Sequence, residues 1–159
     1  MLRKSSVFLA IATFLLFNIG SIIPADKTWY NKLEKPAWSP KDKTFGLVWT
    51  ILFALISFAV VIMIQKGATK KNKKFMVTLG TNYVANQIFP LLQFRYKNMM
   101  ASTADAIIVA FTALLMAITA RKESKLASAL LAPYVLWSTF ASALSTAIYI
   151  KNKPDRVHE

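Results

Sequence analysis

The sequence contains no cysteine, only one histidine and only four glycines in its 159 residues. The absence of cysteine excludes disulfide bonds and thiol chemistry. The one histidine, His158, stands next to the C-terminus, so we expect no metal or haem ligated by histidine or cysteine within the chain. The sequence also has no Gly-rich phosphate loop and no G-x-S-x-G element, which leaves nucleotide and hydrolytic chemistry without support.

Long stretches of the chain lack charge, and 55% of its residues are hydrophobic. Residues 5–25, 44–65, 75–94 and 126–150 contain no Asp, Glu, Lys or Arg, and residues 98–120 contain one. A helix needs about 20 apolar residues to cross a bilayer, and these runs do not alternate as barrel strands would. We therefore predict an all-α, single-domain integral membrane protein with five transmembrane helices, one in each run.

The first run has a second interpretation. Arg3 and Lys4 before an apolar stretch resemble a secretory signal peptide. However, no clear small-x-small cleavage site follows, and the run is longer than the apolar region of a usual signal peptide. We therefore interpret it as the first transmembrane helix.

The net charge of +13 comes mainly from short segments between the runs, such as residues 66–74 and 121–125. Such segments are typical of a cationic rim that contacts anionic lipid headgroups of a bilayer. No soluble basic domain is predicted, so we expect no nucleic-acid partner. Ten Lys and Arg residues fall on each side of the predicted bundle, and the positive-inside rule therefore leaves its orientation open.

The loop of residues 26–43 is unusually aromatic for a connection between membrane helices. It carries Trp29, Tyr30 and Trp38, and prolines such as Pro36 restrict the backbone before them to extended conformations. The aromatic side chains fit an interfacial belt at the lipid headgroups. Composition alone favours the belt, and the alternative is a stiff lid that packs over the mouth of the bundle.

The third run is the most polar. Asn82 and Asn86 are four residues apart and share a helix face, with Gln93 near that face, and Pro90 is expected to kink the helix. These amides either hold helices together or line a cavity. The candidate ligand contacts in this run are Asn86, Gln87 and Phe89.

Asp105 is the only ionisable residue well inside a run. Such a residue is a functional candidate. Alternatively, its carboxylate reaches the interface or pairs with an Asn, a Tyr, Arg95 or Lys97. No second carboxylate or histidine accompanies it, so the sequence predicts no acid–base pair.

Two further runs carry aromatic residues at helical spacing. Phe45, Trp49 and Phe53 share one face of residues 44–65. Aromatic stripes of this kind usually form a core. If this face and the aromatic face of residues 126–150 look at each other, they also make a slot walled by the indoles of Trp49 and Trp137, which suits a flat aromatic ligand. The candidate slot residues of the last run are Tyr134, Trp137, Phe140, Ala141 and Ser145.

Three motifs make the sequence similar to a known family. Residues 29–40 read W-Y-x-x-L-x-K-P-x-W-x-P, residues 45–49 read F-x-x-V-W, and residues 131–144 read L-x-P-Y-x-x-W-x-x-F-A-x-x-L. With Asn82 and Asp105, they resemble bacterial-type members of the translocator protein family. This is the TspO/MBR family, also called tryptophan-rich sensory proteins or peripheral-type benzodiazepine receptors.

The resemblance implies a five-helix bundle in a bacterial cell membrane, usually a homodimer, that has no cofactor. It implies binding of protoporphyrin IX and of isoquinoline carboxamide or benzodiazepine ligands. Some bacterial members degrade protoporphyrin IX in light, and the two tryptophans implicated there match Trp49 and Trp137. The pocket positions implied are Phe53, Asn86, Phe89 and Ala141. The resemblance favours the lid interpretation of the first loop, with lid residues Trp29, Tyr30, Pro36 and Trp38.

This chain departs from the family pattern at several positions. Lys41 stands where the family loop often has a second proline, and Ser145 stands where many members have Asn. An aromatic residue that is common in the third helix of the family is replaced near Ala85 and Asn86, within residues 75–94, which predicts a wider and more polar pocket wall. A transporter of tetrapyrroles or other hydrophobic ligands and a stress-response scaffold remain alternatives. The lack of an internal repeat and of an intramembrane charge pair argues against coupled transport.

Overall fold

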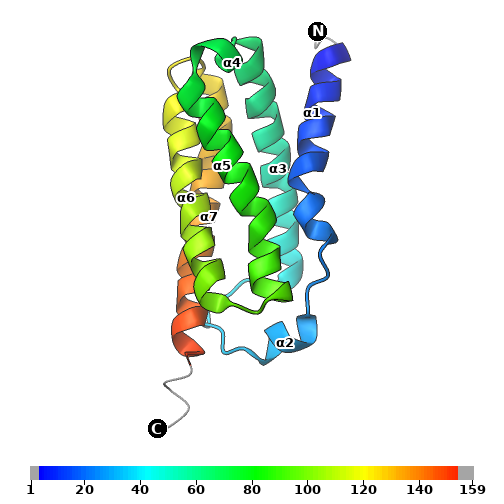
Figure 1. Cartoon of the computed structure of the whole chain (residues 1–159), viewed down its shortest axis with the longest axis vertical. Coiled ribbons are helices and arrows are strands. Elements are labelled where there is room, and N and C mark those ends of the chain that lie inside the picture. The colour runs from blue at the N-terminus through cyan, green and yellow to red at the C-terminus, as the bar shows by residue number, and fades with distance from the viewer. Residues whose placement is uncertain (1–3, 154–159) are drawn as a thin grey trace.

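The chain folds into a bundle of helices (Figure 1). The structure is a computed structural model that describes residues 4–153, so His158 lies outside the described residues. Within residues 4–153 there is no strand, and the predicted all-α class is confirmed. In chain order the elements are α1 (Lys4–Phe17), the 3-10 turn η1 (Ile19–Ile22), α2 (Lys27–Lys32), α3 (Asp42–Gln65), α4 (Ala68–Lys71), α5 (Lys73–Pro90), the π-helical turn η2 (Leu91–Arg95), α6 (Met99–Ala120) and α7 (Lys125–Lys151).

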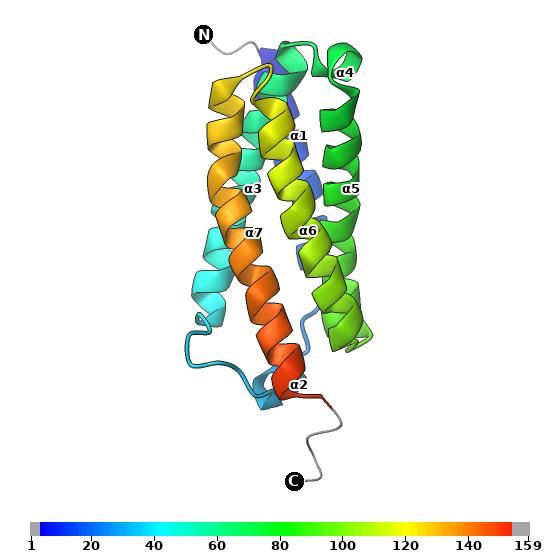
Figure 2. The ribbon, with the colours of Figure 1, turned by 90° about the vertical axis from the view of Figure 1, so that its left-hand side faces the viewer.

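The long helices lie side by side along the longest axis of the molecule (Figures 1 and 2). α6 packs between α5 and α7, α7 packs on α3, and α3 packs on α1. α1 and η1 also contact α5, which closes the ring of helices. α4 lies at the end of the bundle where α1 begins, and α2 lies across the opposite end, near the end of α7 (Figure 1).

Three helices are long and apolar enough to cross a membrane by length and composition. They are α3, α6 and α7, with 24, 22 and 27 residues. At about 1.5 Å per residue, even the shortest exceeds the roughly 30 Å of a hydrocarbon core.

The first predicted helix, residues 5–25, is shorter in the structure than expected. α1 ends at Phe17, and the chain continues through η1 toward Pro24. The side chains of Asn18 and Ser21 compete for local backbone groups: Asn18 Nδ2 donates to the Phe14 carbonyl at 2.8 Å, and Ser21 Oγ donates to the Asn18 carbonyl at 2.6 Å. Such local bonds favour turns over continued helix.

The backbone exposed by this break is paired by a neighbouring helix. Gln87 of α5 accepts a hydrogen bond from the Gly20 backbone N–H at 2.7 Å and donates one to the Phe17 carbonyl at 3.3 Å. A Cβ at residue 20 would stand 3.1 Å from Gln87 Oε1 and 3.4 Å from Pro90 Cγ. Glycine therefore allows η1 to approach α5 closely enough for these bonds.

The third predicted helix, residues 75–94, is also interrupted. α5 ends at Pro90, which has no N–H to donate to the Asn86 carbonyl. The chain widens into the π-helical turn η2, in which the Tyr96 N–H donates to the Leu91 carbonyl at 2.9 Å. π-Helical turns of this kind often occur at functional sites.

The half of the bundle near α4 is solidly packed. Its amide Asn72 caps α5 by accepting from the Phe75 N–H at 3.0 Å and also donates to the Thr119 carbonyl of α6 at 3.0 Å. This half therefore fixes the helices, and the open space lies in the other half. The fully buried side chains of the half near α4 include Ala59, Met63, Phe75, Met116 and Leu131.

Replacing Gln87 should destabilise the fold. Gln87→Leu leaves the Gly20 N–H and the Phe17 carbonyl without their partner in apolar surroundings, and should lower the free energy of unfolding by about 1–3 kcal/mol. Thermal unfolding in detergent measures the loss. Gln65→Leu is the matched control, because Gln65 donates only to the Ser6 hydroxyl, at 2.6 Å. Equal stability of Gln87→Leu and the unchanged protein would contradict the role.

Candidate ligand-binding site

A cavity of about 420 Å³ lies in the half of the bundle near α2. Its lining comes from α1, η1, α3, α5, η2, α6, α7 and the segment that joins η1 to α3. The volume falls in the range of about 300–1,000 Å³ that is typical of small-molecule pockets. The aromatic residues in the lining are Phe17, Tyr30, Phe45, Trp49, Phe53, Phe89 and Phe94.

Trp49 stands at the centre of a run of packed aromatic rings. Its ring centroid lies 5.5 Å from that of Phe53 and 6.2 Å from that of Phe45. Phe53 in turn lies 5.5 Å from Phe17 at the end of α1. This spacing is typical of attractive aromatic pairs, and the rings are tilted by 40–63° relative to their neighbours, so they form an interlocked aromatic wall.

Only part of the candidate set from the sequence lines this cavity. The remaining candidates pack against other parts of the bundle. The candidates in the lining are Trp49, Phe53, Asn86, Phe89, Ala141 and Ser145. The candidates outside the lining are Gln87, Tyr134, Trp137 and Phe140.

The slot with two facing indoles is not the arrangement that the structure has. Phe45 lies between the indoles, with its centroid 6.2 Å from Trp49 and 5.6 Å from Trp137. Trp137 and Phe140, 5.1 Å apart, line a shallow outer groove between α3 and α7 instead. The sequence spacing placed Trp137 on an inward face, but the bulk of Phe45 occupies the space between the two helices. The Trp137 Nε1 atom is buried without a hydrogen-bond partner among the described residues.

A polar network forms the inner end of the cavity. Tyr134 donates to Asn82 Oδ1 at 2.8 Å and accepts from Asn86 Nδ2 at 2.8 Å. Asn82 donates to the Val109 carbonyl at 3.1 Å and to Thr112 Oγ1 at 2.8 Å. Asn82 and Tyr134 are fully buried, so they hold α5, α6 and α7 together. Asn86 both joins the network and lines the cavity.

Asp105 is 7% exposed, and its Oδ2 atom has no hydrogen-bond partner among the described residues. It lies outside the cavity lining, although Ala106 beside it belongs to the lining. The predicted alternatives of pairing with Lys97 or Arg95 do not apply, because Lys97 pairs with Asp26 and Arg95 is exposed. A functional role for this carboxyl group stays a prediction.

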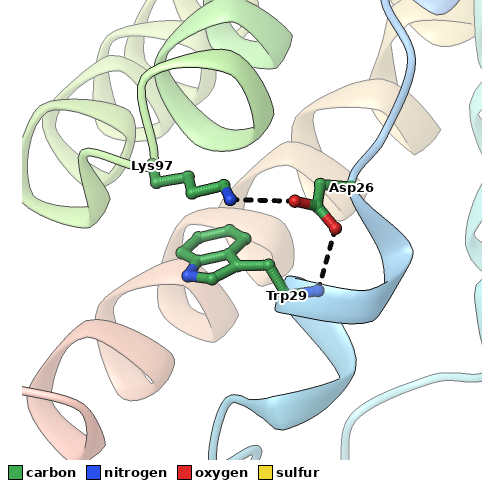
Figure 3. Close-up of polar contacts among 3 residues, drawn as sticks. All are labelled: Asp26, Trp29 and Lys97. Atoms are coloured by element: carbon green, nitrogen blue, oxygen red, sulfur yellow. Dashed lines mark hydrogen bonds and ion pairs between the residues drawn. The ribbon is translucent and has the colours of Figure 1, made fainter.

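Residues 26–41, called the lid below, close one end of the cavity. α2 begins at an Asp26 cap, whose Oδ1 accepts from the Trp29 N–H at 2.9 Å. Asp26 Oδ2 also forms an ion pair of 2.8 Å with Lys97, which precedes α6, and the Lys97 ammonium lies 5.7 Å from the Trp29 ring centroid (Figure 3). The lid thereby contacts the connection between η2 and α6.

The aromatic residues of the lid have different surroundings. Tyr30 lines the cavity and packs edge-on against Phe94 at 5.8 Å. Trp38 packs against Phe140 at 5.6 Å but is 50% exposed. Trp29 is half-buried and Pro36 is buried, and both lie outside the cavity lining. Tyr30 is thus the aromatic residue of the lid that faces the cavity.

A second attachment joins the lid to the end of α7. Asn152 accepts from the Glu34 backbone N–H at 3.0 Å and donates to the Glu34 carbonyl at 2.9 Å. The side-chain amide thereby pairs both backbone groups of one lid residue.

Several cavity residues were not expected from the sequence. Phe17, Asn18, Gly20 and Ser21 line the cavity because the first helix breaks there. The stretch of Asn, Gly and Ser before Pro24 is compatible with such a break, but the same residues also occur in continuous membrane helices. Ile23 and Met99 contribute apolar area that no motif marked.

Removing the Tyr134 hydroxyl should loosen the inner end of the cavity. Tyr134→Phe removes the 2.8 Å donor to Asn82 Oδ1, which keeps only the Asn86 Nδ2 group at 3.1 Å, and should lower the free energy of unfolding by about 1 kcal/mol. Tyr149→Phe, also in α7, is the control, because the Tyr149 hydroxyl makes no hydrogen bond within the described part of the chain. Thermal unfolding of both variants without ligand decides the matter. An equal effect of the two substitutions would contradict the network.

Breaking the ion pair should open the start of the lid. The hydrogen bond from Lys97, together with that from the Trp29 N–H, lowers the pKa of Asp26 below its usual 3.8. The stabilisation is therefore present above about pH 3.8 and is lost as the pH falls through the lowered pKa. Both partners are exposed, so salt should weaken the pair as well.

Lys97→Met should reduce the protection of the Trp29 amide in hydrogen exchange at neutral pH, whereas Lys43→Met, an exposed lysine outside α2, should leave it unchanged. The difference should disappear once acid protonates Asp26. A protection factor that is independent of residue 97 would exclude this attachment.

Comparison with known proteins identifies the family of the chain. Residues 7–150 match the model of the TspO/MBR family. The chain is 45% identical over 143 residues to the uncharacterized membrane protein YtaB of Bacillus subtilis, covering 89% of this chain and 92% of the relative. It is 41% identical over 152 residues to the tryptophan-rich protein TspO of Bacillus cereus, covering 95% and 99%. It is 28% identical over 127 residues to the human translocator protein, covering 78% and 75%.

The match extends over nearly all of the described chain, including the lid, α3 and α7. Three helices of membrane-spanning length and bacterial membrane relatives place the protein in a bacterial membrane. The chain is therefore a member of the TspO/MBR family.

Proposed function

We propose that the chain crosses the bilayer five times, with α1 and η1 forming one span and α5 and η2 another. Large apolar side chains point outward on these shorter helices as they do on α3, α6 and α7. Phe8 and Leu15 of α1 are 74% and 60% exposed, and Val77 and Val84 of α5 are 59% and 52% exposed. Such surfaces are stable against lipid and unfavourable in water. The proposal includes a homodimer within the bilayer, as the family resemblance implies.

The protein's proposed function is to bind flat aromatic ligands, with protoporphyrin IX as the principal ligand. Isoquinoline carboxamide and benzodiazepine compounds belong to the same class. The observation that carries this proposal is the cavity of about 420 Å³ beneath the lid, with Trp49, Phe53 and Phe89 in its lining. Aromatic walls stack on a planar ring, and Ala141 leaves room beside them. Tyr30 of the lid covers the ligand from outside.

Light-dependent degradation of the bound porphyrin is the proposed chemistry. Excited protoporphyrin IX takes one electron from the Trp49 indole, which leaves a porphyrin radical anion and an indole radical cation. The indole radical cation passes its N–H proton to the porphyrin radical anion, and dioxygen, the oxidant, adds to the resulting neutral porphyrin radical at a ring carbon. The peroxyl group closes onto the neighbouring carbon and the hydrogen atom returns to the indole nitrogen. Cleavage of the O–O and C–C bonds then opens the ring to two carbonyl groups, so one dioxygen is consumed and the indole is restored. Trp137 is proposed as a second indole that exchanges an electron with Trp49 by way of Phe45. The Phe45 ring lies 5.6 Å from Trp137 and 6.2 Å from Trp49.

A porphyrin titration tests this function. Purified protein should show saturable quenching of tryptophan fluorescence by protoporphyrin IX in the dark, followed by loss of porphyrin absorbance in light. The double variant Trp49→Phe, Trp137→Phe should keep the apolar walls and bind the porphyrin but lose the light reaction. Trp38→Phe is the control, because Trp38 is exposed and outside the cavity lining.

Each other outcome identifies a different function. Saturable quenching without loss of absorbance would leave a binding or sensing protein that performs no turnover. Porphyrin uptake into liposomes that depends on an ion gradient would favour a transporter. The absence of quenching would exclude protoporphyrin IX as the ligand, and a cellular effect that persists in a cavity variant would favour a scaffold.

A further inference from the structure

Gln93 is a buried polar residue in the lining of the cavity. It is 5% exposed and lies in the π-helical turn η2, three residues after Pro90. Phe94 beside it packs against Tyr30 of the lid, so Gln93 lies at the lid end of the cavity. The widened turn thus places an amide in a mainly aromatic and aliphatic wall.

One atom of the Gln93 amide is already fixed. Ser102 Oγ of α6 donates to Gln93 Oε1 at 2.5 Å. This distance is usual for a bond between two oxygens, which spans about 2.5–3.0 Å, and is short for N–H···O, which spans about 2.7–3.2 Å. The distance therefore assigns the oxygen to Ser102 and leaves Nε2 on the other branch of the amide.

The Gln93 Nε2 group has no hydrogen-bond partner among residues 4–153. A primary amide nitrogen carries two N–H donors. The Nε2 atom is not among the fully buried unpaired atoms, so its donors are accessible where Gln93 lines the cavity. Ser138, the other buried polar side chain in the lining, donates its hydroxyl hydrogen to the Tyr134 carbonyl at 2.7 Å. Asn86 gives its Nδ2 group to Tyr134 and Asn82. Gln93 is thus the buried side chain of the described lining that has donors free for a ligand.

We infer that Gln93 is a specificity-determining residue, which donates hydrogen bonds from Nε2 to an oxygen acceptor at one edge of an otherwise apolar, planar ligand. This inference rests on the proposed function. It adds to the flat aromatic ring a second feature that the ligand needs, an oxygen acceptor at the edge of the ring. The ring lies against Trp49, and a carboxylate or carbonyl oxygen at its edge points to the lid end. Lys27 and Asp42, which line the mouth, carry opposite charges, so net charge there does not select the ligand. The amide selects for oxygen.

The test compares porphyrins with and without oxygen. Protoporphyrin IX carries two carboxylates, its dimethyl ester carries only neutral carbonyls at the same places, and etioporphyrin has alkyl groups and no oxygen. Binding of each to the purified full-length protein is followed by tryptophan quenching in the dark. The unchanged protein should bind the two oxygen-bearing porphyrins more tightly than etioporphyrin.

Gln93→Leu should raise the Kd for protoporphyrin IX about fivefold to tenfold, as expected for the loss of one or two hydrogen bonds. The Kd for etioporphyrin should stay the same. Gln93→Leu should fold, because the Ser102 hydroxyl also reaches the Met99 carbonyl, at 3.1 Å. Gln65→Leu, at the far end of α3, is the matched control and should change neither Kd.

Gln93→Glu provides a second test that does not rely on removing bulk. It keeps the acceptor for Ser102 and replaces the free donors with an oxygen, so it should weaken protoporphyrin IX at least as much as Gln93→Leu does. An equal loss for acid and ester in Gln93→Leu identifies the acceptor as a carbonyl oxygen, and a larger loss for the acid identifies it as a carboxylate.

Two results would overturn the inference. If Gln93→Leu weakens etioporphyrin as much as protoporphyrin IX, Gln93 only shapes the cavity, and the proposed function survives without it. If Gln93→Glu binds protoporphyrin IX as tightly as the unchanged protein, no donor acts at this position. Failure of all three porphyrins to bind the unchanged protein would instead refute the proposed function, and this inference with it.

Discussion

The architecture depends on pairing every backbone group in surroundings that offer no water. A continuous helix meets this requirement by itself, but this chain interrupts two helices at the same level, after Phe17 and after Pro90. Gln87 pairs the backbone groups of the first interruption, and the π-helical turn re-pairs the second. Where α1 and α5 are interrupted, the two chains fill the space between the helices less completely than two continuous helices would. The cavity lies at these breaks.

The remaining polar residues divide the bundle into a fixed half and an open half. Asn72 joins α5 to α6 near α4, and the network of Asn82, Tyr134 and Asn86 joins three helices at mid-length. Beyond that network the helices are joined by aromatic packing, by the lid and by single polar contacts such as those of Thr103 with Ser145 and of Ser102 with Gln93. The inner surface of the cavity is therefore preformed, which would lower the cost of binding the proposed ligand.

The apolar runs and the aromatic loop were predictable from the sequence because each depends on local patterning. The runs predicted α3, α6 and α7 to within a few residues, and the motifs around Trp29 and Trp49 predicted the family. The break after Phe17 was not predicted, because Asn, Gly and Ser in an uncharged run also occur in continuous membrane helices. The local bonds of Asn18 and Ser21 favour the break, but the partner that pairs its backbone, Gln87, is 67 residues away from Gly20. The position of Trp137 was missed because helical spacing gives a face but not the volume of Phe45 opposite it.

The bond between Asn152 and Glu34 has an evolutionary consequence. Both hydrogen bonds reach the backbone N–H and carbonyl of residue 34, so any amino acid except proline at that position can keep them. The lid's attachment to α7 is thus largely independent of the lid's own sequence. Side chains around the mouth can drift between related proteins, and with them the compounds admitted, while the lid keeps its place at the end of the bundle.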